Sequence, residues 1–202
     1  SEQDDGGNSQ EGYNTSLTFP FRIVVEYVNR KPTFDVEASF IGGLELLEDQ
    51  GPYNAVFASA ISLGPNNAAE RAQTGFFRAV PVGNAASLFS AQPVISWDGI
   101  SEAANLSFIP GLHQHGTALF HVTLKDTGGV RRGGQDTSDP PTVLNITLAS
   151  VNDAPRFNLS MSRLFVDENS PGLLTFRSFA TNITAGAPNE AQQEITFDLN
   201  VT

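Results

Sequence analysis

Hydrophobic and polar residues alternate one for one in two long stretches of the chain. In the first, every second residue from Leu17 to Tyr27 is apolar. In the second, residues 118–124 follow the same pattern. A period of two residues is typical of a β-strand with one face on a core. Both stretches therefore predict strands, and we expect most of the core of the first to lie outside the chain.

Shorter apolar runs lie between turn-forming residues in the middle of the chain. They cover Ala55–Ile61, Phe76–Val82, Pro93–Trp97, Asn105–Ile109, Thr117–Leu124 and Val143–Leu148. Helix-forming runs are scarce, and only Asn66–Gln73 indicates a helical turn. About seven strands in this length are typical of a Greek-key β-sandwich. The sequence therefore predicts an all-β protein.

Segments of the chain also resemble one another in sequence at a nearly constant separation. The pairs of similar segments are Val28–Pro32 with Val151–Pro155, Leu47–Pro52 with Val166–Pro171, Phe57–Gly64 with Phe179–Gly186, and Glu70–Phe77 with Glu190–Phe197. Their separations of 119 to 123 residues indicate like domains in series. We therefore assign residues 1–29 to a preceding repeat, 30–152 to one complete repeat and 153–202 to the following repeat. The turn Asp4–Gly7 and a strand at Ile195–Val201 belong to these partial repeats.

Composition narrows the classes of function. The net charge is −11, from 22 acidic and 11 basic residues, and there is no basic stripe. This balance argues against binding to nucleic acid or to anionic lipid and is compatible with divalent cations. No apolar run reaches the roughly 18 residues that a membrane span needs. The absence of cysteine excludes disulfides and thiolate metal sites.

Six asparagines stand in the N-glycosylation pattern, which is more than chance predicts for this composition. They are Asn14, Asn105, Asn145, Asn158, Asn182 and Asn200. The excess indicates a secreted glycoprotein, so we predict an extracellular or cell-surface location. We expect the side chains of Asn105, Asn145 and Asn158 to point to solvent. The alternative is that an asparagine-rich β protein carries such patterns without glycans.

Four motifs together resemble a known family. They are Val151–Pro155, Leu47-Glu48-Asp49, the turn Asp126–Gly129 and the loop Gly133–Ser138. This combination, over nearly the whole chain, resembles the cadherin-like tandem repeats of large extracellular surface and adhesin proteins. The resemblance implies immunoglobulin-like Greek-key sandwiches in tandem, with calcium at the joints between them.

The same resemblance implies a set of calcium ligands. They are Glu48, Asp49, Asp126, Asn152 and Asp153 at one joint, with Asp167 and Glu168 repeating the role of Glu48 and Asp49 in the next domain. Calcium needs six to eight oxygens, so these residues must converge. Otherwise they are surface acids that only solvate turns. At Asn29–Pro32 two cations, Arg30 and Lys31, replace the acidic residue, so we expect a weak calcium response there.

Histidine and aromatic residues offer further candidate sites. His113 and His115 alternate around Gln114, but no third metal ligand lies near them in sequence, so we interpret them as loop residues. His121 is expected to face outward. Trp97 suggests either a sugar-stacking platform or core packing. We favour the core, because phenylalanines occupy alternating strand positions at 19, 21, 57, 108, 120 and 179.

No nucleophile motif, paired metal histidines on a helix or phosphate-binding glycine loop is present, so we do not expect an enzyme. The predicted function is a structural and adhesive repeat of a rod or filament, stiffened by calcium. Its expected partners are other copies or repeats of the array, and extracellular proteins or glycans. The alternatives are a lectin-like carbohydrate-binding module and a spacer repeat in a large surface receptor or enzyme.

Overall fold

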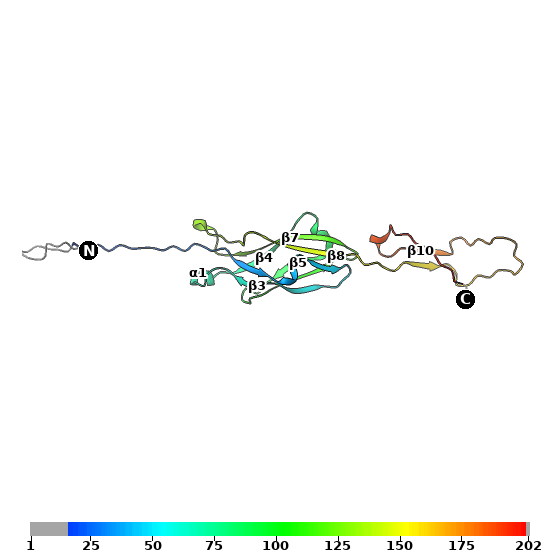
Figure 1. Ribbon diagram of the computed structural model, residues 1–202, viewed down its shortest axis with the longest axis horizontal. Helices are drawn as coiled ribbons and strands as arrows, with labels where there is room; N and C mark the ends of the chain where they lie inside the picture. The colour runs from blue at the N-terminus through cyan, green and yellow to red at the C-terminus, as the bar shows by residue number, and fades with distance from the viewer. Residues whose placement is uncertain (1–15, 201–202) are drawn as a thin grey trace, which may run out of the picture.

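The computed structural model describes residues 16–200 and is elongated (Figure 1). A β-sandwich lies in the middle, residues 16–28 extend from one side, and residues 153–200 extend from the other. The sandwich begins at Thr33 and ends at Ala149. Its two ends are therefore the places where the chain enters and leaves it.

Two four-stranded sheets form the sandwich. One sheet has the order β1 (Thr33–Val36), β3 (Tyr53–Ser62), β6 (Ala104–Pro110) and β5 (Phe89–Ser96). The other has the order β2 (Leu44–Leu47), β8 (Thr142–Ala149), β7 (Gly116–Asp126) and β4 (Gly75–Pro81). All neighbours are antiparallel except β2 and β8, which are parallel. The all-β prediction is confirmed, and β3 to β8 are the six strands expected from the apolar runs.

The core lies between the two sheets and follows the predicted alternation. Along β7 the inward side chains of Ala118, Phe120, Val122 and Leu124 are each at most 1% exposed. The first three of these belong to one cluster with inward residues from the other strands, including Phe57, Leu106, Phe108, Leu144, Ile146 and Leu148. Full burial of one such side chain stabilises the fold by about 1.5–3 kcal/mol. Apolar burial therefore holds this sandwich together without disulfides.

The aromatic residues divide between the core and the surface. Trp97 is half-buried against the core, with its ring 6.5 Å from that of Phe77. Its indole nitrogen donates to the carbonyl of Ser101 at 2.7 Å. Of the six phenylalanines expected in a core, 57, 108 and 120 are buried and 179 is half-buried, whereas 19 and 21 are exposed. The interpretation of Trp97 as a packing residue is confirmed.

Helical segments are short. The helix α1 (Ala68–Arg71) falls within the expected turn, and the Asn67 side chain caps it by accepting the N–H groups of Ala69 and Glu70. The 3₁₀ helices are η2 (Ala38–Phe40), η3 (Ala85–Leu88), η4 (Arg131–Gly133) and η5 (Pro188–Glu190). Two of these segments matter for the site, because α1 carries a buried Glu70 and η5 a buried Glu190.

Beyond the sandwich, β9 (Arg156–Leu159) and β10 (Ala180–Thr184) form an antiparallel pair. Its outer partners are Arg156 with Thr184 and Leu159 with Ala180. The pair β1–β3 has partners Thr33 with Ser62 and Val36 with Ala58, 122 or 123 residues earlier. Each pair contains a register irregularity and one non-glycine residue of positive φ. This residue is Ala60, at 48°, in the first pair and Asn182, at 50°, in the second. The same local strand pairing therefore occurs twice.

Two strand predictions were wrong. Residues 16–28 form no strand, and alternate side chains such as Phe21 and Val25 are 85% and 91% exposed. Residues 195–200 likewise form no strand. Alternation describes two faces of a chain, but a strand also needs a hydrogen-bonded neighbour, and neither segment has one among the residues that the structure describes. The predicted turn Asp4–Gly7 lies outside the described residues.

Candidate functional site

Glu48 is a buried carboxylate at the end of the sandwich where the chain leaves β8. It directly follows β2 and is only 2% exposed. Its Oε1 accepts hydrogen bonds from the N–H of Val151 at 2.8 Å and the hydroxyl of Ser150 at 3.0 Å. Its own N–H donates to the carbonyl of Ala149 at 2.8 Å. These contacts attach the segment after β8 to the end of β2.

The same carboxylate binds a residue far along the chain. The side-chain amide of Asn189, in η5, donates to Oε2 and Oε1 of Glu48 at 3.1 and 3.3 Å. A buried carboxylate needs several donors to offset its desolvation, and these bonds supply them. Glu48 therefore joins the sandwich to the segment that follows it.

Glu190 is the second buried carboxylate at this end and is 5% exposed. It accepts the N–H of Asp153 at 3.0 and 3.1 Å and the N–H of Ala187 at 3.3 Å. The Gln193 side-chain amide donates to Glu190 at 3.3 Å and to the Asn152 side chain at 3.0 Å. This network fixes the backbone of the predicted joint, Asn152-Asp153, against η5.

At the opposite end, where the chain enters the sandwich, Glu70 is 4% exposed. It accepts the N–H of Arg30 at 3.3 Å and the side-chain amide of Gln73 at 2.6 Å. The same Gln73 amide donates to the side-chain oxygen of Asn29 at 2.8 Å. A buried glutamate in or beside a short helix thus holds the incoming backbone as well.

The networks at the two ends use the same residue types in the same roles. Each has a glutamate followed three positions later by a glutamine, Glu70–Gln73 at one end and Glu190–Gln193 at the other. Each glutamate accepts the N–H of the residue after an asparagine, in Asn29-Arg30 and in Asn152-Asp153. In each, the glutamine donates both to its glutamate and to that asparagine. The brace, as we call this Asn/Glu/Gln network, therefore occurs at both ends of the sandwich.

Asp126 adds a buried acid to the brace at the entry end. It is the last inward residue of β7 and is 2% exposed. Its Oδ1 accepts from the side-chain amide of Asn29 at 2.8 Å and from the N–H of Gly128 at 2.9 Å, whereas its Oδ2 is buried without a hydrogen-bond partner. Burial raises the pKa of Asp126; the two hydrogen bonds oppose this shift, and the carboxylates of Asp136 and Glu70 add to it.

The predicted calcium ligands do not all converge, because Asp126 lies at the other end of the sandwich. Asp126 ends the 11-residue strand β7, and the other end of that strand, Gly116, pairs with Leu148 near the exit. At about 3.4 Å per residue, these ends lie roughly 30 Å apart. The prediction that Asp126 joins Asn152 and Asp153 is therefore wrong, because the turn after β7 faces the entry end.

Asp167 and Glu168 also lie apart from the joint. Both are exposed, in the segment between β9 and β10. Within residues 16–200, one group of three side chains has the spacing of metal ligands, and neither residue belongs to it. They match Glu48 and Asp49 in sequence position, but not in burial or contacts.

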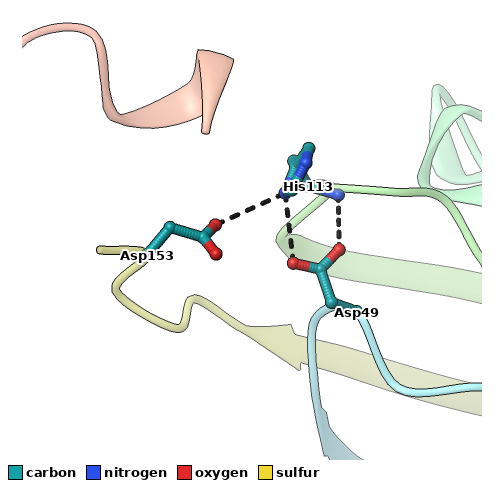
Figure 2. Close-up of side chains that lie close together, drawn as sticks. All are labelled: Asp49, His113 and Asp153. Carbon is teal, nitrogen blue, oxygen red and sulfur yellow. Dashed lines mark hydrogen bonds and ion pairs between the residues drawn. The ribbon is translucent and has the colours of Figure 1, made fainter. Parts of the chain in front are cut away.

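That group is Asp49, His113 and Asp153, which come from three separate segments (Figure 2). Asp49 follows β2, His113 lies between β6 and β7, and Asp153 lies between β8 and β9. His113 Nδ1 is 3.1 Å from Asp49 Oδ2 and 3.5 Å from Asp153 Oδ2. The side chains are 28%, 27% and 35% exposed in chain order, so solvent ions can reach them.

The donor set at the exit end does not fit calcium, which takes an all-oxygen shell. Both oxygens of Glu48 and the side-chain oxygen of Asn152 already accept hydrogen bonds. A histidine nitrogen lies between the two remaining carboxylates, Asp49 and Asp153. Calcium at this joint stays a prediction from the resemblance, without support from the arrangement of these residues.

Sequence reasoning found the joint but missed most of its contacts. The spacing Glu70–Gln73 and Glu190–Gln193 was visible as part of the repeat, and it was the available signal for the brace. His113 gave no such signal, because its partner Asp49 is 64 residues away in sequence. His115 and His121 are exposed, as expected for a loop residue and an outward strand residue.

The asparagines of the glycosylation pattern are exposed at positions 105, 158, 182 and 200. Asn145 differs from the prediction: it is half-buried on β8, and its side-chain oxygen is covered and has no hydrogen-bond partner. The reason is local: Gly43, just before β2, lies against this side chain, since a Cβ there would be 3.3 Å from Asn145 Nδ2. Asn14 lies outside the described residues.

Comparison of the chain with protein-family models, with curated proteins and with solved structures found no match. Among the helices in the described part of the chain, none is long and apolar enough to cross a membrane. The braces at the two ends and the Asp49–His113–Asp153 group are therefore the features from which a function is argued.

Proposed function

We propose that the chain is a non-enzymatic structural segment of a tandem array of immunoglobulin-like Greek-key sandwiches, acting as a rod outside the cell or on its surface. The strand order supports this class of fold. In immunoglobulin-like domains one sheet holds strands A, B, E and D, and the other holds C, F and G. The order β1-β3-β6-β5 corresponds to A-B-E-D, and β8-β7-β4 corresponds to G-F-C, with β2 as a second part of strand A.

The observation that carries the proposal is the repetition of the brace. Residues about 120 apart make the same set of contacts with the chain as it enters and as it leaves the sandwich. The strand pairing of β9 with β10 repeats that of β1 with β3 in register. The simplest explanation is one domain plan used in series, with one kind of joint.

The brace gives such a joint stiffness. A hydrogen bond to a charged group is worth about 1.5–3 kcal/mol, roughly twice a neutral one. In each brace the glutamate accepts such a bond from a backbone N–H of the joint. The donor is Arg30 at one end and Asp153 at the other. Bending at the joint must break these bonds and expose a buried carboxylate. Neighbouring domains are thereby held in a fixed direction.

The proposed partners are other copies or repeats of the array, together with extracellular proteins or glycans. The exposed asparagines of the glycosylation pattern are compatible with an extracellular location. A lectin-like module has less support, because its best aromatic residue, Trp97, packs on the core. A spacer repeat in a large receptor or enzyme uses the same joint mechanics and differs only in what the other domains do.

Small-angle scattering on the chain tests the proposal. We expect Glu190→Ala to broaden the distribution of interatomic distances, since the segment after the sandwich loses its brace. Glu194→Ala, four residues on and exposed, is the matched control. An unchanged distribution for Glu190→Ala, with the sandwich still folded by circular dichroism, would contradict a stiffening role.

A further inference from the structure

Three segments of the chain place ligand atoms around one point at the exit end. The imidazole of His113 lies between the carboxylates of Asp49 and Asp153 (Figure 2). The ligand atoms, one from each side chain, all lie within 4.8 Å of one another. Two of these residues belong to the end of the sandwich, and the third belongs to the joint itself.

The inner oxygens of the two carboxylates both face Nδ1 of the His113 ring. The backbone N–H of His113 donates to Asp49 Oδ1 at 2.7 Å, which fixes that carboxylate and turns Oδ2 to the ring. Asp153 Oδ2 is covered from solvent and accepts no hydrogen bond; it forms an ion pair with His113 Nδ1 at 3.5 Å. A covered carboxylate oxygen without a donor is costly unless a cation neutralises it. This covered oxygen therefore favours a cation beside it.

We propose that Asp49, His113 and Asp153 bind a zinc ion. Zinc takes imidazole nitrogen at about 2.0–2.1 Å and carboxylate oxygen at about 2.0–2.2 Å in tetrahedral geometry. Those bond lengths place neighbouring ligand atoms about 3.3–3.5 Å apart. The separations from His113 Nδ1, 3.1 and 3.5 Å, are close to this spacing. Water completes the fourth position.

The donor types select zinc over calcium. Calcium prefers oxygen ligands and needs six to eight of them, whereas imidazole is a common ligand for zinc and its neighbours in the transition series. Two carboxylates and a neutral imidazole balance the charge of a divalent ion. The hydrogen bond to Asp49 Oδ1 is the kind of outer contact that orients a metal-binding carboxylate.

Within residues 16–200, no equivalent group of ligands lies at the other joint. The residue after Asn29 is Arg30, at the position that Asp153 occupies after Asn152. Arg30 therefore places a positive charge where the exit joint has the carboxylate of Asp153, so the third ligand is missing. Zinc would therefore fasten the exit joint alone, by tying Asp153 to the end of the sandwich. This deepens the proposed joint function, although zinc binding itself rests on the three side chains and not on the existence of an array.

Calorimetric titration of the metal-free chain with Zn²⁺ tests the site, with Ca²⁺ titrated in parallel. We expect one zinc per chain, and at least a ten-fold weaker affinity in His113→Asn and in Asp153→Asn. His115→Asn is the matched control, because His115 is exposed two residues away, and its affinity should equal that of the wild type. Circular dichroism establishes that each variant is folded. Hydrogen exchange should show that zinc slows opening at residues 150–156 in the wild type but not in His113→Asn.

The proposal is overturned if the folded wild type binds no zinc, or if His113→Asn binds it as tightly as the wild type. In the first case the three side chains contact one another without a metal; in the second the ion binds elsewhere. Calcium binding that is insensitive to His113→Asn, without zinc binding, would overturn it in favour of an oxygen site. None of these results affects the scattering comparison of Glu190→Ala with wild type in metal-free buffer. Failure of the zinc proposal is therefore distinguishable from failure of the proposed stiffening role of the brace.

Discussion

The backbone N–H of Asp153 donates to both carboxylate oxygens of Glu190, at 3.0 and 3.1 Å, across 37 residues. At the other end of the sandwich, the N–H of Arg30 donates to one oxygen of Glu70, Oε1, at 3.3 Å. Because the buried carboxylate accepts a backbone N–H, this hydrogen bond does not depend on which side chain the donating residue carries. The brace therefore tolerates a cation at Arg30 and an acid at Asp153, which a shared calcium site would not.

Loss of a brace should loosen its own joint and leave the core intact. In Glu190→Ala, the N–H groups of Asp153 and Ala187 lose their acceptor, so we expect their amide exchange to accelerate roughly ten-fold or more. Exchange in β6 and β7 should not change. Hydrogen exchange followed by NMR measures both. Equal rates at Asp153 in Glu190→Ala and in the control Glu194→Ala would show that the bond contributes nothing.

Gly64 should be essential for the entry brace. It has φ +145°, and a Cβ there would lie 2.5 Å from Oε2 of Glu70, so alanine would displace the buried carboxylate. We expect Gly64→Ala to lower the free energy of unfolding by about 1–3 kcal/mol. Gly51→Ala is the control, because no atom lies within 4 Å of its Cβ position. Denaturant titration compares the two, and a similar cost for both would contradict the close contact.

The sandwich should depend on its aromatic core. Phe57 is fully buried, with its ring 5.2 Å from that of Phe40. We expect Phe57→Ala to cost about 3–5 kcal/mol of unfolding free energy. Phe76→Ala, on β4 with a 53% exposed side chain, should cost about 1 kcal/mol or less. Urea unfolding of the two variants measures the difference, and a cost for Phe76→Ala equal to that for Phe57→Ala would place the core elsewhere.

Much of the fold was predictable because its strands carry a local signal. Along the strands β3 to β8, less and more exposed residues alternate for much of the length, and a period of two is visible in the sequence. The strand β2 was not predicted. It has only four residues, and its parallel pairing with β8 depends on tertiary structure. For residues 16–28 the prediction failed in the opposite way. The alternating pattern is present, but no neighbouring strand pairs with it among the described residues.

The site was predictable only as far as it is local. Asn152 and Asp153 were identified because they adjoin each other in a repeated motif. Glu190 and His113 reach them through the fold, over 37 and 40 residues. The misplacement of Asp126 has a similar cause, since a sequence motif does not say which end of a strand faces which joint. A topology is needed before such residues can be grouped.

The buried Asp126 should make the stability of the sandwich depend on pH in an unusual direction. Burial raises the pKa of Asp126 in the folded state above its ordinary value of 3.8. The folded state then takes up the proton at a higher pH than the unfolded chain does, so the contribution of Asp126 falls as pH rises from 3.8 through the raised folded pKa. Above that window the cost of the buried charge is complete.

Asp98 supplies a control of opposite sign. The backbone N–H groups of Ser101 and Ile100 donate to its Oδ1 at 2.7 and 2.9 Å, and they hold its pKa below the ordinary value. Its contribution is present above pH 3.8 and is lost as pH falls through the lowered folded pKa. The two aspartates should therefore respond oppositely to acid.

The measurement is urea unfolding of wild type, Asp126→Asn and Asp98→Asn between pH 7 and pH 3. As pH falls, the stability of wild type relative to Asp126→Asn should increase, because protonation removes the buried charge. The stability of wild type relative to Asp98→Asn should decrease over the same titration. Asparagine keeps the Oδ1 acceptor in both variants, so neither substitution removes the hydrogen bonds that the backbone donates. If both differences changed in the same direction, Asp126 would not be the buried, partly unpartnered acid that closes the entry end of the sandwich.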